Sequence, residues 1–464
     1  MKSPAATLVL AGLAAGHVAS NSKAAFVAQQ LAAESAPNAV SMSTMQSIKT
    51  QQREADRENG LFDVDRYAVQ GATKCSNGKA GEYSCRNVDL AGFLRHQDTG
   101  SGDREGNDIW AWTSSSSGRE FGIVGQTDGT AFVEVLSDGS LQYVGRLPTQ
   151  TVPSTWRDIK VLGDHAYIGA ESPDHGLQIF DLNKLLSIDP ENPKTFNIST
   201  DLTAHYNEFG SSHNIVVHDT TNTISAVGTK PKDGCNAGLW MIDVSDPSKP
   251  KKSGCVSNDG YVHDAQCVIY SGPDQKFNGR EICFNYNEDT LTIVDITERS
   301  SPKQLSRTTY KGATYTHQGW LADKEMRYLL LDDELDEMQK TGPAANQKTT
   351  TYIVDIADLS KPVFSGLYQS PVKSIDHNQY VVNGLSYQSN YGSGLRIVDV
   401  SSVVEDPTGA SFKEAGFFDV HPEDDGRGGE ATFHGSWSVY PWLKSGYILI
   451  NSIERGVYSV KYTA

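Results

Sequence analysis

The chain has 464 residues, 38% of them hydrophobic and 21% charged, so it can bury a large core in one closed β-architecture or in a few ordinary domains. Its 57 Asp and Glu against 40 Lys and Arg give a formal net charge of −17, which excludes nucleic acid as an expected partner and favours cations as ligands. No apolar run after the first twenty residues is long enough to span a bilayer, so no membrane anchor is expected.

The first residues are typical of a secretory signal peptide. Lys2 precedes an apolar stretch at Ala5–Ala15, and small residues follow as far as Ser20. We therefore expect a signal peptide at residues 1–20 and an extracellular, secreted protein. Residues 21–59 are rich in Ala, Ser and Gln and show little periodicity, which predicts a flexible leader before a folded domain at residues 60–464.

The six cysteines predict three disulfides, because their number is even and the chain is expected to be exported. Among the possible pairings the local ones are favoured: Cys75 with Cys85, Cys235 with Cys255, and Cys267 with Cys283. The sequon Asn197-Ile-Ser predicts N-glycosylation of Asn197, with an unused sequon as the alternative.

From about residue 107 onwards the sequence repeats. An apolar strand ending in an acidic residue recurs, and lysine replaces the acid in the seventh copy: Ala131–Glu134, Leu177–Asp181, Leu239–Asp243, Leu291–Asp295, Tyr352–Asp355, Leu395–Asp399 and Val457–Lys461. A polar residue that enters a strand precedes each copy, so two separate elements both occur seven times. Repeats of about 40–60 residues with several short strands each are typical of propeller blades. The pattern predicts an all-β, seven-bladed β-propeller.

The seventh copy lies only three residues before Ala464, so the last blade lacks an outer strand of its own. An unpaired strand edge is costly, and Arg86–Leu94 is well placed to pair with it. We therefore expect a ring closed by this N-terminal strand, with the Cys75–Cys85 loop as its brace.

Five longer segments of the sequence resemble a known family: Gly122–Val135, Trp156–Asp181, Gly260–Asp295, Tyr315–Glu337 and Asn451–Gly456. They resemble the LVIVD-repeat β-propellers of the choice-of-anchor B family over most of residues 60–464. The resemblance implies a propeller fold and an extracellular location, and it implies no established reaction. Members are named for variable C-terminal surface anchors, and since this sequence shows no sorting signal or apolar tail, a freely secreted form is expected.

A ring of histidines and carboxylates is the main candidate site. The start of the innermost strand and the turn between the second and third strands share one face of the disc, and five innermost strands begin with a histidine. The candidate metal ligands are His213, His263, His317, His377, His434 and Asp158, of which His263, His317 and His377 match best. Imidazole with carboxylate favours a divalent transition metal, whereas carboxylates with carbonyls would favour calcium. The alternatives are histidines that act only as spacers between blades, and a metal-free pocket.

Two further groups of residues are expected to be mainly structural. The acidic run Asp332–Glu337 lacks the order of an EF-hand loop, which favours a solvated turn over a calcium site. Four tryptophans near the innermost strands are expected to wedge blades apart as core, with stacking on sugar rings as the alternative: Trp110, Trp156, Trp320 and Trp437.

The sequence contains no recognised catalytic motif. It therefore favours a binding or interaction module, with an extracellular protein or glycan as partner and a divalent metal ion as a candidate cofactor in the funnel. The alternative is a metal-dependent extracellular hydrolase or lyase in which Glu288 or Glu334 is the general base. A purely structural matrix component is the third hypothesis.

Overall fold

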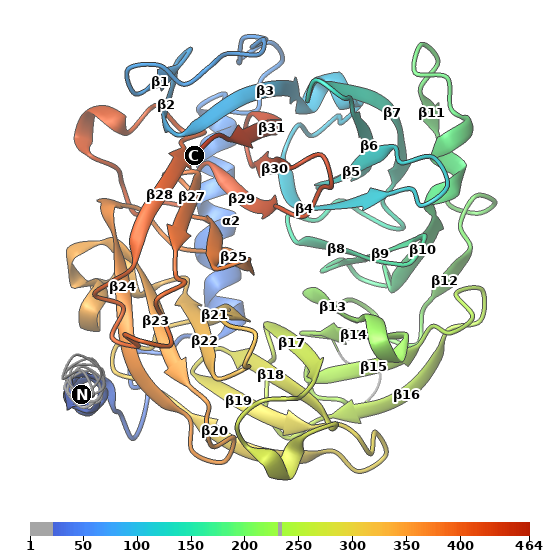
Figure 1. The fold of residues 1–464 in the computed structure, drawn as a ribbon. Coiled ribbons are helices and arrows are strands. Elements are labelled where there is room, and N and C mark those ends of the chain that lie inside the picture. The colour runs from blue at the N-terminus through green and yellow to red at the C-terminus, as the bar shows by residue number, and fades with distance from the viewer. Residues whose placement is uncertain (1–21, 231–233) are drawn as a thin grey trace, which may run out of the picture.

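A computed structural model describes residues 22–230 and 234–464, and the expected signal peptide lies outside the described residues. Seven sheets of mainly antiparallel strands surround a central axis, as Figure 1 shows in a view along that axis. This is the seven-bladed β-propeller that the repeats predict. In the first six blades the four main strands run in chain order from the innermost strand outwards. In the last blade β29 is innermost, and the outer strand, β3, comes from the N-terminal part of the chain.

The first four blades follow one another without interruption. Their strands are β4 (Gly106–Thr113), β5 (Glu120–Gln126), β6 (Gly129–Val135) and β7 (Leu141–Pro148); β8 (Arg157–Leu162), β9 (His165–Ala170), β10 (Leu177–Asp181) and β12 (Ala204–Tyr206); β13 (Asn214–His218), β14 (Thr223–Val227), β15 (Leu239–Asp243) and β16 (Lys251–Val256); and β17 (Asp264–Ile269), β18 (Glu281–Asn287), β19 (Thr290–Asp295) and β20 (Lys303–Thr308). A two-residue strand, β11 (Lys194–Thr195), pairs in parallel with the outer strand of the first blade.

The last three blades include both ends of the folded chain. Their strands are β21 (Thr316–Leu321), β22 (Tyr328–Asp333), β23 (Lys348–Asp355) and β24 (Val363–Lys373); β25 (Asn378–Val382), β26 (Leu385–Ser389), β27 (Leu395–Asp399) and β28 (Lys413–Phe418), extended by β2 (Tyr83–Arg86) and β1 (Lys79–Ala80); and β29 (Ser436–Tyr440), β30 (Tyr447–Ser452), β31 (Gly456–Tyr462) and β3 (Val88–Arg95).

Strand β3 closes the ring. It pairs antiparallel with β31, with Val88 opposite Tyr462 and Arg95 opposite Gly456. Its buried side chains face the core of the last blade, where the ring of Phe93 lies 4.5 Å from that of Tyr458. The edge of the C-terminal strand is therefore paired by a segment from the other end of the sequence.

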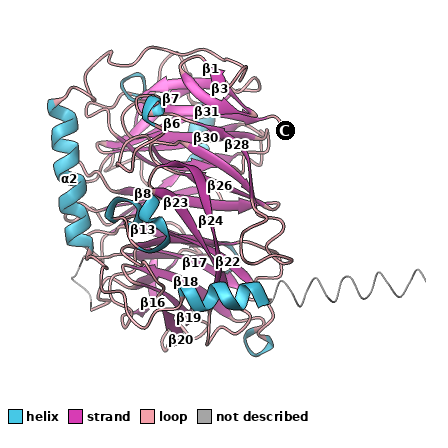
Figure 2. Cartoon of the chain, turned by 90° about the vertical axis from the view of Figure 1, so that its left-hand side faces the viewer, coloured by secondary structure: helices cyan, strands magenta, loops and turns pink. Residues whose placement is uncertain are grey.

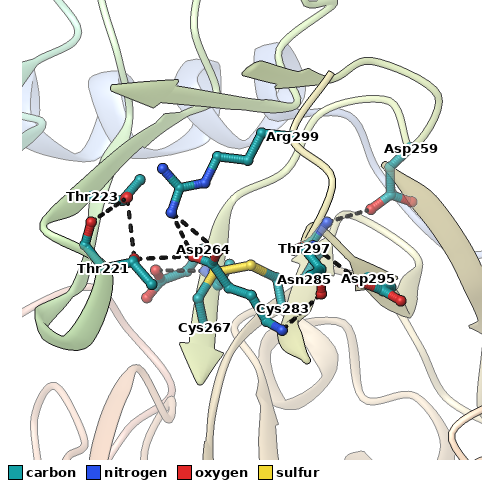
Figure 3. The surroundings of a disulfide bond; sticks show 12 residues. Thr221, Thr223, Asp259, Asp264, Cys267, Cys283, Asn285, Asp295, Thr297 and Arg299 are labelled. Carbon is teal, nitrogen blue, oxygen red and sulfur yellow. Dashed lines mark hydrogen bonds and ion pairs between the residues drawn. A yellow bond between two sulfur atoms is a disulfide. The ribbon is translucent and has the colours of Figure 1, made fainter. Parts of the chain in front are cut away.

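The structure forms three disulfides, Cys75–Cys85, Cys235–Cys255 and Cys267–Cys283, which are the local pairs. Cys267 and Cys283 are directly opposed on β17 and β18, and Figure 3 shows this bridge with its surroundings. Three disulfides fit an oxidising, extracellular environment. Asn197 is exposed in the connection between β11 and β12.

The segment expected to be a flexible leader is largely helical instead. A helix spans residues 22–31, and helix α2 (Met42–Glu58) lies along one face of the disc, as Figure 2 shows. One stripe of α2 is buried: Met42, Met45, Lys49, Arg53 and Asp56. Three of these five residues are charged, so the stripe has no apolar periodicity that a reading of the sequence would recognise as an amphipathic helix. Neither helix, nor any other in the described part of the chain, is long and apolar enough to cross a membrane.

The start of α2 depends on a capping serine. Ser41 has an extended backbone, and its Oγ accepts a hydrogen bond from the backbone N–H of Thr44 at 3.4 Å. We expect Ser41→Ala to destabilise the docked helix by about 1 kcal/mol, because an N-terminal N–H loses its partner. Faster amide hydrogen exchange in α2 measures the effect. Thr50→Ala, at an exposed position of the same helix, is the control, and equal exchange in both variants would contradict the prediction.

Candidate metal centre

Four histidines form a continuous arc on the face of the disc that α2 covers. They come from the starts of four neighbouring innermost strands, β13, β17, β21 and β25. The ring centroids are 4.1 Å apart for His213 and His263, 4.1 Å for His263 and His317, and 4.3 Å for His317 and His377. All four side chains are buried, and burial holds the pKa of His263, His317 and His377 well below the usual value, so these imidazoles are neutral near pH 7.

Hydrogen bonds to the next blade fix the tautomers. His263 Nδ1 donates to the carbonyl oxygen of His317 at 2.9 Å, and His377 Nδ1 donates to the carbonyl oxygen of Trp437 at 2.5 Å. A carbonyl oxygen can only accept, so in both rings Nε2 keeps its lone pair. His317 Nδ1 lies 3.3 Å from Asp332 Oδ1, which also accepts from a backbone N–H. The spacer role therefore uses Nδ1, while Nε2 has the form that ligates metals.

Glu334 adds a buried carboxylate to this arc. It follows β22, and it is fully buried. Its Oε2 lies 3.7 Å from His317 Nε2, and its Oε1 lies 3.4 Å from His377 Nε2. Oε2 accepts no hydrogen bond from any described residue. His263, His317 and Glu334 each contribute one ligand atom, and these three atoms lie within 4.8 Å of one another. Their lone pairs would stabilise a cation placed between them.

Lys49 of α2 supplies the positive charge at this point. Its ammonium contacts Glu334 Oε1, and it lies 5.0 Å from the ring centroids of both Phe433 and Trp437. Burial lowers the pKa of Lys49, and the neighbouring Glu334 acts in the opposite direction. Sequence reasoning missed Lys49, because it lies in the segment expected to be flexible.

Other residues of α2 contact the remaining polar groups of this face. Met42 N donates to Glu288 Oε1 at 2.6 Å, and Gln46 Nε2 donates to Glu171. Arg53 and Arg57 both pair with Glu105. The helix thus covers the acidic turns with its own hydrogen-bond donors.

Two of the predicted ligands do not join the arc. His434 Nε2 lies 2.8 Å from Asp56 Oδ1 on α2. Asp158 Oδ1 accepts from Lys160 Nζ at 2.7 Å, and its other oxygen accepts from Ile215 N at 2.7 Å. Both side chains therefore have partners of their own away from Glu334.

The solvated turn expected at Asp332–Glu337 is wrong. Apart from Leu335 the run is acidic, and each of its acidic side chains is buried. Asp333 accepts hydrogen bonds from the backbone N–H groups of Thr314 and Tyr315, and these bonds stabilise its carboxylate in a buried position. Burial raises the pKa of Asp336 and Glu337 well above the usual value. Trp156 and Trp437 pack with Met42 and Met45 of α2, whereas Trp110 and Trp320 are only partly buried near the centre of the disc.

Comparison with known proteins agrees with the repeat pattern. The LVIVD repeat family matches residues 155–183, 234–257, 285–309 and 345–370, one segment in each of four successive blades. The chain is therefore a seven-bladed β-propeller that carries LVIVD repeats. No curated protein matches it.

Among solved structures, two similar chains are the computationally designed Ika8 protein and the hydrazine synthase of Kuenenia stuttgartiensis. Ika8 is 9% identical with a TM-score of 0.44, and the alignment covers 86% of this chain and 98% of that one. Hydrazine synthase is 10% identical with a TM-score of 0.47, and the alignment covers 86% of this chain and 99% of that one.

Proposed function

We propose that this propeller is a secreted binding module that holds one divalent transition-metal ion between His263, His317 and Glu334. The observation that carries the proposal is the convergence of imidazole Nε2 lone pairs on a carboxylate oxygen that is buried and unpaired. Lys49 pairs with Oε1 of this carboxylate, and a metal ion at Oε2 would stabilise the remaining acceptors, because lone pairs and a carboxylate repel one another. The three disulfides and the signal-peptide pattern at residues 1–20 support secretion.

The donor set indicates the class of metal. Imidazoles with a single carboxylate suit zinc, iron, manganese or copper, whereas calcium prefers oxygen ligands alone. The partners of the Nδ1 atoms complete the site, since Asp332 and two backbone carbonyls orient the rings as outer-sphere acceptors do in known metal sites. His377 lies next in the arc and is a candidate for a further ligand.

A binding role is favoured over hydrolysis because neither candidate general base is free. Glu334 belongs to the proposed ligand set, and Glu288 accepts a hydrogen bond from Met42 N. Helix α2 also covers this face, and Lys49 shares the carboxylate of Glu334. The ion at this position would stabilise the covered face of the disc.

Metal content tests the proposal. Protein secreted and purified without chelators is expected to contain about one transition-metal ion per chain by elemental analysis. His317→Ala is expected to lose the ion, because it removes one ligand and the contact with Asp332. His434→Ala is the control, since its ring pairs with Asp56 and lies outside the ligand set.

Glu334→Gln separates metal loss from misfolding, because it keeps the shape of the side chain while it removes the charge. It is expected to lose the ion and keep the circular dichroism spectrum of the parent. Absence of stoichiometric metal from the parent protein would overturn the proposal and favour the spacer role of the histidines.

A further inference from the structure

At the centre of the disc, between the innermost strands, a cavity of about 870 Å³ lies on the face opposite α2. Residues of all seven innermost strands line it, mostly from the halves of the strands that lead away from the histidine arc. Figure 1 views the disc from this side, with α2 behind it. The volume lies within the range of about 300–1,000 Å³ that is typical of small-ligand sites.

One wall of the cavity is a cluster of five aromatic rings: Trp110, Trp320, Tyr380, Tyr440 and Trp442. Trp442 is at its centre, with its ring centroid between 4.9 and 6.0 Å from those of the other four. All of these rings except Tyr380 are only half-buried. Apolar surface concentrated in a concave site is typical of a binding site, because its exposure to water is unfavourable until a ligand covers it.

Hydrogen-bonding groups face the same cavity. Asp264 accepts through Oδ1 from Ala265 N at 2.7 Å, and Gln266 accepts through Oε1 from Leu321 N at 2.9 Å. Within the described ranges, Asp264 Oδ2 and Gln266 Nε2 have no hydrogen-bond partner. The cavity thus offers one acceptor and one donor from β17, at positions two residues apart on one side of the strand, together with the aromatic rings.

Two lysines line the cavity: Lys444 is exposed, whereas Lys160 is buried deeper and is already paired. Lys160 Nζ lies 2.7 Å from Asp158 Oδ1, 3.3 Å from Asp108 Oδ2 and 4.9 Å from the ring centroid of Trp110. The ammonium of Lys160 already lies over the ring of Trp110 and would repel a cationic ligand there. An anionic ligand would be repelled by Asp264 and by the two aspartates that pair with Lys160. A neutral ligand avoids both penalties.

We propose that this cavity binds a neutral carbohydrate. The C–H faces of a pyranose ring are apolar and pack on tryptophan, while its hydroxyl groups donate and accept hydrogen bonds in the same plane. Trp110, Trp320 and Trp442 supply the stacking faces, and Asp264 and Gln266 supply the acceptor and the donor. The site lies on the other face of the disc from the metal centre, so either proposal can fail while the other holds.

Titration with a panel of neutral trisaccharides (maltotriose, cellotriose, laminaritriose and mannotriose) tests the proposal on the full secreted protein. Tryptophan fluorescence and isothermal titration calorimetry measure binding. At least one trisaccharide is expected to bind, and Trp442→Ala and Gln266→Ala are each expected to weaken it by about tenfold or more. Trp156→Phe is the control for the fluorescence signal, because Trp156 packs beneath α2.

Three results would overturn the proposal. The first is sugar binding that Trp442→Ala and Gln266→Ala leave unchanged, which would place the sugar elsewhere. The second is binding of tetramethylammonium chloride in place of the sugars, which would make the cluster a cation cage. The third is binding of neither, which would make the five rings part of the core.

Discussion

Lys49→Met will destabilise the metal-free protein by about 3–5 kcal/mol. The ammonium of Lys49 and the carboxylate of Glu334 are both buried, and the substitution leaves the carboxylate without its counter-charge. Methionine keeps most of the side-chain length and the contacts with Phe433 and Trp437. Calorimetric unfolding of protein stripped with a chelator measures the loss. Glu54→Gln, an exposed change on the same helix, is the control and is expected to shift stability by less than about 0.5 kcal/mol.

Zinc should reverse this loss if Glu334 is a metal ligand. In Lys49→Met the ion no longer competes with an ammonium for the carboxylate, so zinc affinity is expected to rise at least about tenfold over the parent. Zinc at about one hundred times its dissociation constant then restores roughly 2.7 kcal/mol by mass action. A variant as stable as the parent without metal would show that Lys49 is not seated on Glu334. A variant that zinc does not stabilise would contradict the metal site while leaving the helix contact intact.

Leu90→Ala will open the ring where its two ends meet. Leu90 is 2% exposed on β3 and packs in the core of the last blade with Tyr458 and Val460. Truncation of a buried leucine costs about 2–5 kcal/mol, and here the loss falls on the strand that closes the ring. Chemical denaturation measures the loss, and limited proteolysis near β3 and β31 reports the opening. Val69→Ala, at a position 68% exposed, is the control, and a similar effect of both variants would show that β3 does not hold the ring.

The blades could be predicted because each one repeats the same solution. An innermost strand that starts with a polar residue and a third strand that ends in an acid recur at regular intervals. A copy that matches the pattern poorly can therefore be assigned from its spacing to the clear copies. The same repetition predicts that His263, His317 and His377 begin neighbouring innermost strands, and their rings lie 4.1 and 4.3 Å apart in turn. His434 starts the corresponding strand, but Asp56 of α2 attracts its ring, and no repeat contains that information.

Helix α2 could not be predicted from the repeats, because nothing in the sequence around it is repeated. Its buried stripe includes Lys49, Arg53 and Asp56, which on sequence alone are typical of an exposed helix or a disordered leader. These charges are buried only because the propeller presents Glu334, Glu105 and His434 at matching positions. Burial of the acidic turn could not be predicted for the same reason, since Asp333 is stabilised by backbone N–H groups that lie elsewhere in the blade.

The position of α2 and β3 at the beginning of the chain has a consequence for biosynthesis. Both segments leave the ribosome before any blade exists, yet β3 pairs with β31 and Lys49 contacts Phe433 and Trp437 near the other end of the sequence. Each must remain undocked while the intervening blades are made, and contacts so distant in sequence form slowly. Docking of α2 is therefore a late event that requires the last blade, and a chain whose translation stops early would expose both an unpaired strand edge and an uncovered histidine arc to the quality-control machinery.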